Sequence, residues 1–577
     1  MTKQRKAFVS ILLATVMLFS MGTTASAASN SAIVVATNAL TTIINIAFKA
    51  LTSTFPKQGI PDVEDYDASE LKAGFYEGNG TFLDEPAENA VWSLGFGMRS
   101  IVPEDLLNGK KKYYTGGYFT QQIDSVYDDQ RVHAIAMNDG SGRGTSVFAS
   151  IDGIGTGNAD IRAIRLLAEE KLAERGIDSD LVSININATH CHTVIDTQGI
   201  SLMLIAQVLH NIGAKYAPFL DPIRSIDSTF YDVMIEGAAE AIVEAYVNME
   251  TGSLYYCETA GIAKDTEKGV YTQDDFSYIF NKRYDTEGFQ NFFACFKFVP
   301  DNSASKATVF VNIGAHPTTI DRATSKLSAD FPVYIEKKLN EQGMNFMFIQ
   351  GAQAPISVRK GAVVNAEVEA EIAQDEVHTE YRSAKSLGYE FARLISEACE
   401  NAVAVEPMLN VKMAECKVML DPGLLQLGAA SQLLGFTTVS DSASDSGYSI
   451  ITEVGYVEIG KDIVLLTVPG ELVPQLVFGD VIDANESYLG TAWELPCTAD
   501  LIGEDKTVLV MGLCNDAIGY IVPDNDYAPF IADTIWNTDL GEKVFGKYRR
   551  HYEELLTTGG KAATSVMGAL NELVESN

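Results

Sequence analysis

The sequence predicts an α/β fold, in which short buried strands alternate with amphipathic helices. Short apolar runs rich in β-branched residues recur along the chain, and several are followed at once by glycine or by a chemically active side chain. These runs lie at 146–152, 181–192, 307–317, 345–355, 462–471 and 506–516. They read as strands, several of them buried on both faces. Apolar residues at helical spacing between them, at 161–172 and 387–398, predict the helices.

Polar side chains of these runs accumulate where each predicted strand ends. Open α/β sheets bind ligands outside the carboxyl ends of their strands, so we expect the functional site there. Two polar stretches, the acidic 367–376 and the Ser/Asp-rich 440–447, are interpreted as surface insertions.

The first 27 residues have the features of a secretory signal peptide. A basic start, MTKQRK, precedes an apolar run over 7–21 and a small-x-small site ending at Ala27. This pattern predicts cleavage after Ala27 and a secreted or extracellular protein. An uncleaved membrane anchor is the alternative.

Residues 28–85 are expected to form an amphipathic helix followed by an acidic linker. Polar residues recur every three or four positions through the apolar stretch 32–51, which favours an amphipathic helix over a membrane span. That helix either docks onto the body of the protein or makes peripheral contact with a membrane. Residues 52–85 are rich in Pro, Gly and acidic side chains and are interpreted as the linker. The main domain is expected to occupy 86–577.

Composition narrows the classes of partner. The chain has 42 Lys and Arg against 77 Asp and Glu, a formal net charge of −35. Such a charge repels phosphate backbones, so we expect no nucleic-acid partner. The seven cysteines include no CxxC pair and suggest neither a disulfide framework nor a cysteine zinc site. The oligomeric state is left open.

Three of the seven histidines follow two of the predicted strands. His190 and His192 in ATHCHT are two residues apart on a strand-like run, so their side chains would leave the same face, and His316 in GAHP precedes a proline. This arrangement suits metal or oxyanion binding, and a hydrogen-bonded structural histidine is the alternative. Glu471 in VPGE and Asp152 in SIDGIG are similarly placed carboxylates, for which a cap or salt bridge is the alternative.

The order of these motifs resembles the neutral ceramidase family of secreted zinc amidases. The matching segments are GFGMRSIVPEDL (95–106), GGY (116–118), SIDGIG (150–155), ATHCHT (188–193), NKR (281–283), AHPTTI with LSADFP (315–332), VPGE (468–471), GYIVPDNDY (519–527) and HYEE (551–554). The resemblance covers roughly residues 90–560, and it rests on the ordered set because no single motif is specific.

The resemblance implies a set of site residues. The zinc ligands would be His190, His316, Glu471 and Tyr520. His192 and one of Lys282 or Arg283 would lie beside the metal and hold the substrate's polar head or the developing oxyanion, and Tyr552 would be a further pocket residue. Two imidazoles and a carboxylate form a donor set that suits Zn²⁺.

Three departures from the family pattern stand out. The family's GDxSP segment is GAQAP at 351–355, so Ala354 replaces its serine. The Ser-Gly-Pro that follows the family's histidine pair is replaced by TVID. We also expect the family's C-terminal immunoglobulin-like domain to be missing, because only one helical pattern, 562–573, follows HYEE.

The function that the sequence favours is a secreted zinc hydrolase acting on ceramide-like N-acyl amide bonds of sphingolipids, or on related bonds. Zinc-activated water would attack the carbonyl while zinc and His192 stabilise the oxyanion. Two alternatives remain. One is a catalytically inactive ligand-binding or surface protein on the same scaffold, which the loss of serine at Ala354 supports. The other is a zinc ester or lactone hydrolase for a non-lipid substrate.

Overall fold

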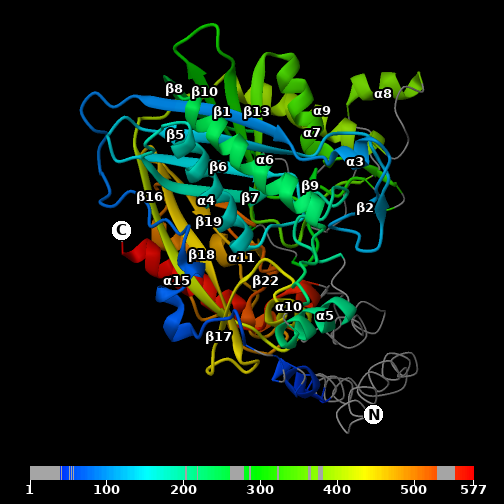
Figure 1. Cartoon of the computed structure of the whole chain (residues 1–577). Coiled ribbons are helices and arrows are strands. Elements are labelled where there is room, and N and C mark those ends of the chain that lie inside the picture. Colours follow the sequence, from blue (N-terminus) through cyan, green and yellow to red (C-terminus); the bar gives the residue numbers. More distant parts are fainter. Residues whose placement is uncertain are drawn as a thin grey trace.

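The structure is a computed structural model. It describes residues 57–201, 205–217, 219–259, 278–284, 288–320, 324–360, 365–374, 381–528 and 553–576, with Arg322 and part of the segment 39–55. Four layers are stacked in it, in the order helices, large sheet, small sheet and helix (Figure 1).

A nine-stranded mixed sheet forms the larger layer. Its strand order is β13-β11-β10-β8-β1-β5-β6-β7, and β15 pairs with β8. The bounds are β1 Trp92–Ser100, β5 Arg131–Asn138, β6 Thr145–Ile151, β7 Leu181–Ala188, β8 Glu250–Glu258, β10 Ala294–Pro300, β11 Ala307–Ile313, β13 Met344–Gln350 and β15 Val403–Ala404. The pairs β6–β7 and β11–β13 are parallel, whereas the pairs between them are antiparallel.

One face of this sheet is covered by helices. Alternate residues of β5 and β6, such as Ala134 and Val147, pack against α4 (Asn158–Glu174) and α6 (Ser228–Val247). Residues of β10 and β11 pack in the same way against α7 (Asp330–Glu341) and α9 (Arg382–Cys399). The other face of the large sheet, including Phe148 and Phe310, packs on the second sheet.

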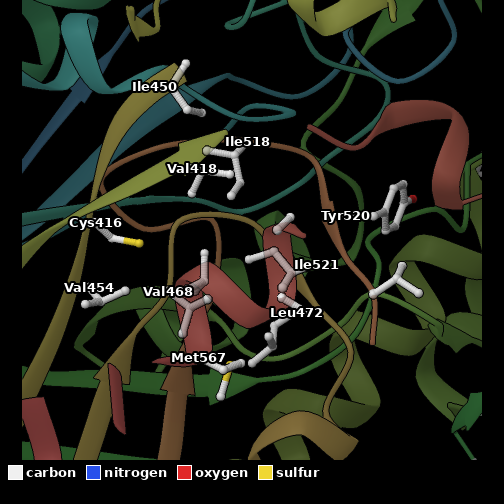
Figure 2. Packing of buried hydrophobic residues seen from close by; sticks show 14 of the residues in the cluster. Cys416, Val418, Ile450, Val454, Val468, Leu472, Ile518, Tyr520, Ile521 and Met567 are labelled. Carbon is white, nitrogen blue, oxygen red and sulfur yellow. The ribbon is translucent and has the colours of Figure 1, made fainter. Parts of the chain in front are cut away.

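The second sheet has the order β16-β18-β19-β21, with β17 paired to β18. Its strands are β16 Leu409–Met419, β17 Thr437–Ser440, β18 Tyr448–Ile459, β19 Ile463–Thr467 and β21 Thr507–Met511. Its outer face packs on α15 (Ala562–Glu575), with Cys416, Val418 and Val454 of the sheet in one cluster with Met567 of the helix (Figure 2).

The predicted α/β class is confirmed, and each of the six predicted strand runs contains a strand that ends before the run's last polar residues. Of the two predicted surface insertions, the acidic one is mostly exposed where it is described, whereas the Ser/Asp-rich one is partly buried and needs correction. Residues 366–373 form helix α8 (Ala366–Ala373), and 440–447 is the tight connection between β17 and β18. Asp441 in that connection is buried, because its carboxylate accepts hydrogen bonds from the Ser449 hydroxyl (2.8 Å) and the Ala443 N–H (2.8 Å).

The proposed signal peptide lies outside the described residues. Within 32–51, residues 45–50 are helical, Phe48 packs against the core, and Ile43 and Ile46 are exposed. The segment interpreted as a linker is packed onto the body, because Tyr66 is buried and its hydroxyl donates to Glu415 (2.6 Å). Among the described residues, no helix is both long and apolar enough to cross a membrane.

Candidate metal centre

The two histidine motifs reach one point from two strands of the large sheet. His190 and His192 lie in the loop that follows β7, and His316 follows β11. His190 has φ +64°, a left-handed conformation in which histidine is enriched compared with most other residues. The expectation that both side chains leave one face of a strand is therefore corrected, since a left-handed turn after the strand brings them together.

Glu471 completes the cluster from the second sheet's side of the molecule. It begins the short strand β20 (Glu471–Leu472), which pairs in parallel with β22 (Tyr520–Ile521) so that Glu471 lies opposite Tyr520. One Glu471 carboxylate oxygen, Oε2, is 3.1 Å from Nε2 of His190 and 3.1 Å from Nε2 of His316. Side chains up to 281 residues apart in sequence thus converge.

Backbone carbonyls orient two of the imidazoles. Nδ1 of His190 is 2.7 Å from the Ile154 carbonyl oxygen, and Nδ1 of His316 is 2.8 Å from that of Ile356. A carbonyl only accepts, so each Nδ1 carries a proton, and in the neutral form of each ring Nε2 has a lone pair available to a metal ion at the centre of the cluster. This is the arrangement that commonly orients metal-binding histidines.

His192 is held differently. Its ring lies edge-on to Tyr118 at 5.4 Å between centroids, and the backbone of Gly117 approaches so closely that an added Cβ would be 2.1 Å from Cγ of His192. Burial lowers the pKa of His192 well below its ordinary value, with the neighbouring His190 adding to the effect. His192 is therefore neutral at physiological pH.

The charges of the other three groups depend on one another. Burial alone would raise the pKa of Glu471, but His190 and His316 outweigh it and hold that pKa well below its ordinary value. Burial likewise opposes the charged form of His190, yet the Glu471 carboxylate raises its pKa. For His316 burial prevails, and its pKa is lowered despite the hydrogen bond to Glu471. Glu471 is thus a carboxylate at every ordinary pH.

This donor set fits a divalent cation. The ligand atoms of His190, His192 and His316 all lie within 4.8 Å of one another. Nε2 of His192 is buried without a hydrogen-bond partner among the described residues, whereas Nε2 of His190 faces the Glu471 carboxylate oxygen at 3.1 Å. Tetrahedral ligands about 2.1 Å from a zinc ion lie about 3.4 Å apart, so the 3.1 Å separations to Glu471 need little change. Imidazole and carboxylate donors suit zinc.

A small pocket of about 70 Å³ opens onto the cluster. His190, His192, Glu471 and Tyr520 line one part of it. Apolar side chains form much of the rest, namely Phe119, Ile154, Ile200, Leu425, Leu513, Ala517 and Leu556. The cluster is therefore accessible to a small group bordered by apolar surface.

Three predicted residues lie elsewhere or outside the described chain. Arg283 does not line this pocket, and its guanidinium instead pairs with Asp526 (3.0 Å), Glu553 (3.0 Å) and Glu554 (2.9 Å). A fully buried guanidinium requires such counter-charges, so its contacts indicate a structural position rather than the oxyanion role expected for it. Lys282 is half-buried with its ammonium 5.9 Å from the centre of the Phe280 ring, and it does not line the pocket either. Tyr552 lies outside the described residues.

Two further expectations concern Ala354 and Asp152. Ala354 is fully buried, its N–H donates to the Leu472 carbonyl (3.1 Å), and it does not line the pocket. Asp152 neither caps a helix nor lines the pocket, and its carboxylate accepts from the Arg131 N–H at the start of β5, at 3.0 Å. Burial raises the pKa of Asp152 to about 6.

Sequence reasoning did not assign roles to Gly117, Ile154 and Ile356. The first two lie in motifs that were recognised, GGY and SIDGIG. Ile356 directly follows GAQAP, and its contribution is a backbone carbonyl, which no side-chain pattern reveals.

Of the comparisons with known proteins, the one with solved structures gives matches. No protein-family model matches the sequence, and no curated protein matches it. The crystal structure of neutral ceramidase from Pseudomonas aeruginosa superimposes with a TM-score of 0.56 at 13% identity, covering 84% of this chain and 74% of that chain. The chain has a ceramidase-like fold. A structure described as ceramidase complexed with C2 shares this ceramidase-like fold, with a TM-score of 0.54 and 12% identity over 84% of this chain and 75% of that one.

Proposed function

We propose that the chain is a zinc-dependent hydrolase that cleaves the amide bond of ceramide-like N-acyl lipids. The observation that carries the proposal is the convergence of His190, His316 and Glu471, with both Nδ1 atoms bound to backbone carbonyls and both Nε2 atoms directed at one carboxylate oxygen. The ceramidase-like fold supports the same reaction class.

We assign His190, His316 and Glu471 as the residues that hold the metal, with Tyr520 beside Glu471 as the fourth ligand. A bound Zn²⁺ supplies a Lewis acid that polarises a carbonyl and activates water at neutral pH. The buried Glu471 carboxylate offsets part of the cation's charge, which lowers the cost of holding the ion away from solvent.

His192 is assigned to the substrate rather than to the metal. Its Nε2 has no hydrogen-bond partner among the described residues, and its ring lines the pocket. A neutral imidazole can donate one hydrogen bond from a ring nitrogen. We therefore propose that His192 holds the carbonyl oxygen as negative charge develops on it, a contribution that costs about 2.7–4 kcal/mol when such a donor is removed.

The apolar pocket wall supports a lipid substrate. Phe119, Ile200, Leu425 and Leu556 border the cluster, and one structure with this fold is described as complexed with C2. These side chains would exclude water from the reacting amide while the acyl chain extends along them.

The size of the pocket favours a second candidate, hydrolysis of a small non-lipid amide or ester. Its volume of about 70 Å³ is small beside the roughly 300–1,000 Å³ of pockets for drug-sized ligands. Such a pocket holds the reacting group and little more. The two candidates differ in the acyl chain length that they predict to be optimal.

The test is hydrolysis by the full-length, zinc-loaded protein of an N-acylsphingosine series of increasing acyl length, alongside small amides and esters. Released fatty acid is measured by mass spectrometry. Lipid specificity predicts kcat/KM rising with acyl length, whereas the second candidate predicts the reverse. Hydrolysis that is undetectable for every substrate and unaffected by added zinc would contradict the enzyme proposal.

Variants separate metal ligands from substrate contacts. His190→Ala and His316→Ala should lose both zinc and activity, whereas His192→Ala should keep zinc and lose about two to three orders of magnitude in kcat. His210→Ala is the matched control, because His210 is on α5 (Ile205–Tyr216) and binds the Asp221 carbonyl at 2.9 Å. It should behave like the wild type.

We also propose that the protein is exported and that its first 27 residues are removed. The support is the sequence pattern of the signal peptide. N-terminal sequencing of exported material should begin at Ala28. Recovery of the full-length chain from membranes after a carbonate wash would contradict cleavage.

A further inference from the structure

Three cysteines far apart in sequence lie together at one place on the large sheet. Cys257 is on β8, Cys295 is on the neighbouring strand β10, and Cys399 is the last residue of α9. The Sγ atoms of Cys257 and Cys399 are 3.7 Å apart, which is van der Waals contact. Cys257 and Cys295 are directly opposed in the antiparallel β8–β10 pair.

We propose that Cys257 and Cys399 are a disulfide-forming pair that closes when the protein meets a low-molecular-weight disulfide oxidant. Disulfide sulfurs are about 2.05 Å apart, so the two sulfurs must approach by about 1.6 Å from their 3.7 Å contact. Side-chain rotation at the end of α9 supplies such a movement more easily than a change in the sheet.

The strand register excludes Cys295 as the partner. The Thr259 N–H donates to the Phe293 carbonyl at 3.1 Å, so these opposed residues form a hydrogen-bonded pair. Pair types alternate along an antiparallel ladder, which makes Cys257 and Cys295, two positions further on, a hydrogen-bonded pair as well. Such pairs hold their Cα atoms about 5.5 Å apart and their side chains farther apart than the other type, whereas a disulfide needs Cβ atoms about 3.8 Å apart.

The accessibility of the thiols sets the order of the steps. Cys399 is half-buried, whereas Cys257 is buried and Cys295 is fully buried. The Cys399 thiolate attacks one sulfur of the oxidant RSSR, forming a mixed disulfide and releasing one RSH. The Cys257 thiolate then attacks the Cys399 sulfur and releases the second RSH. Two protein thiols are thereby oxidised, one RSSR is reduced, and the two thiol protons leave on the two RSH molecules.

Neighbouring thiols disfavour the thiolate in the reduced protein. A hydrogen bond with Cys295 raises the pKa of Cys257 to about 12, and a hydrogen bond with Cys257 raises the pKa of Cys399 above its ordinary value. The reaction should therefore be slow at neutral pH and faster as pH rises, because the thiolate is the attacking species.

The disulfide would close a long loop through one half of the large sheet. The chain between Cys257 and Cys399 contains β10, β11, β13, α7 and His316. Cross-linking residues so far apart reduces the conformational freedom of the unfolded chain, so the oxidised protein should unfold at a higher temperature.

Peptide mapping tests the pair directly. The full-length protein is freed of reductant, incubated with oxidised glutathione at pH 8, alkylated under denaturing conditions and digested. Mass spectrometry should find one peptide pair linked through Cys257 and Cys399, with Cys295 alkylated. The oxidised protein should melt a few degrees higher than the reduced one.

Two variants test whether the disulfide joins Cys257 and Cys399. Cys399→Ser should abolish the linked peptide and the melting shift, whereas Cys497→Ser, which removes another half-buried thiol, should change neither. A Cys257–Cys295 link, a glutathione adduct on Cys399 that never closes, or full alkylation of both thiols after oxidation would each overturn the proposal. If Cys399→Ser does not fold, the wild-type peptide map alone decides.

Discussion

At the scale of single residues, backbone conformation decides where the histidines point. The spacing of His190 and His192 was compatible with one face of a strand, but the φ of +64° at His190 places both in a turn beyond β7. The residue types could be predicted from the sequence. The orientation of the His190 ring could not, because it depends on the Ile154 carbonyl, which is 36 residues away in the chain.

Gly117 should be required for the position of His192. A Cβ at this residue would be 2.1 Å from Cγ of His192, so Gly117→Ala must displace the ring or the loop. We expect at least a tenfold loss of activity with zinc still bound, measured by kcat and by metal content.

Gly568→Ala is the matched control, because nothing lies within 4 Å of its added Cβ and Gly568 is inside helix α15. It should raise stability by about 0.5–1 kcal/mol without altering activity. Equal activity of Gly117→Ala and the wild type would show that His192 does not need this contact.

Asp516 should make stability fall as pH rises. Burial raises its pKa to about 8 from an ordinary 3.8. A group whose pKa is raised in the folded protein stabilises the fold fully below the unfolded value, and this contribution is lost as pH rises through the folded value.

Asp516→Asn should remove this dependence, since the amide oxygen can still accept from the Asn158 and Ala517 N–H groups. Relative to wild type, the variant should gain about 1–3 kcal/mol between pH 5 and pH 8. Thermal unfolding of both proteins across that range is the measurement. Parallel stability curves would mean that Asp516 is already ionised in the folded protein.

At the scale of elements, strands were more predictable than connections. Apolar β-branched runs such as 307–313 have few alternatives to a buried strand, so β11 could be predicted. A polar segment can form a turn, a helix or a surface loop, so its structure is harder to predict from the sequence. Residues 440–447 are polar in sequence but pack as a hairpin turn, because the Asp441 carboxylate accepts a hydrogen bond from Ser449 and forms an ion pair with Lys417.

Two elements carry apolar side chains suited to a membrane surface. Ile46 on the N-terminal helix and Phe219 after α5 are 62% and 84% exposed. Both elements contact the α10 region (Leu424–Ala430), one through a hydrogen bond between Thr52 and Gln426 and the other through one between Asn211 and Ser431.

We expect the double variant Ile46→Ser, Phe219→Ser to bind zwitterionic phosphatidylcholine vesicles several-fold more weakly than wild type. The measurement is vesicle flotation. Leu166→Ser, which removes an exposed leucine of α4, is the control and should bind like wild type. Unchanged flotation of the double variant would show that Ile46 and Phe219 do not contribute to membrane binding.

For the whole molecule, the succession of strand-like and helical runs predicted the fold class, and the structure brings together four of the site residues proposed from the motifs. His190, His192, His316 and Glu471 meet, and Tyr520 lines the same pocket. The position of Arg283 could not be predicted, because its partners Asp526, Glu553 and Glu554 come from segments more than 240 residues away. The contact between Cys257 and Cys399 could not be predicted either, because the two residues are 142 positions apart in the sequence.

Ala354 stands where the neutral ceramidase family has a serine, so restoring that serine tests whether catalysis needs it. A methyl group cannot attack a carbonyl, and Ala354 is buried outside the pocket. If the metal centre is sufficient, the wild type hydrolyses its substrate and Ala354→Ser changes kcat only modestly. An inert wild type made active by Ala354→Ser would favour the inactive binding protein as the native function.

The metal content of the purified protein shows whether His190, His316 and Glu471 hold zinc. The full-length chain, its four variants His190→Ala, His316→Ala, Glu471→Gln and His192→Ala, and the His210→Ala control are stripped with chelator, re-equilibrated with Zn²⁺ and analysed by elemental mass spectrometry, with circular dichroism confirming the fold. We expect one tightly bound zinc per chain in the wild type, His192→Ala and His210→Ala, and far less in the other three. A folded wild type without zinc, or His190→Ala and His316→Ala variants that bind as much zinc as wild type, would contradict this expectation.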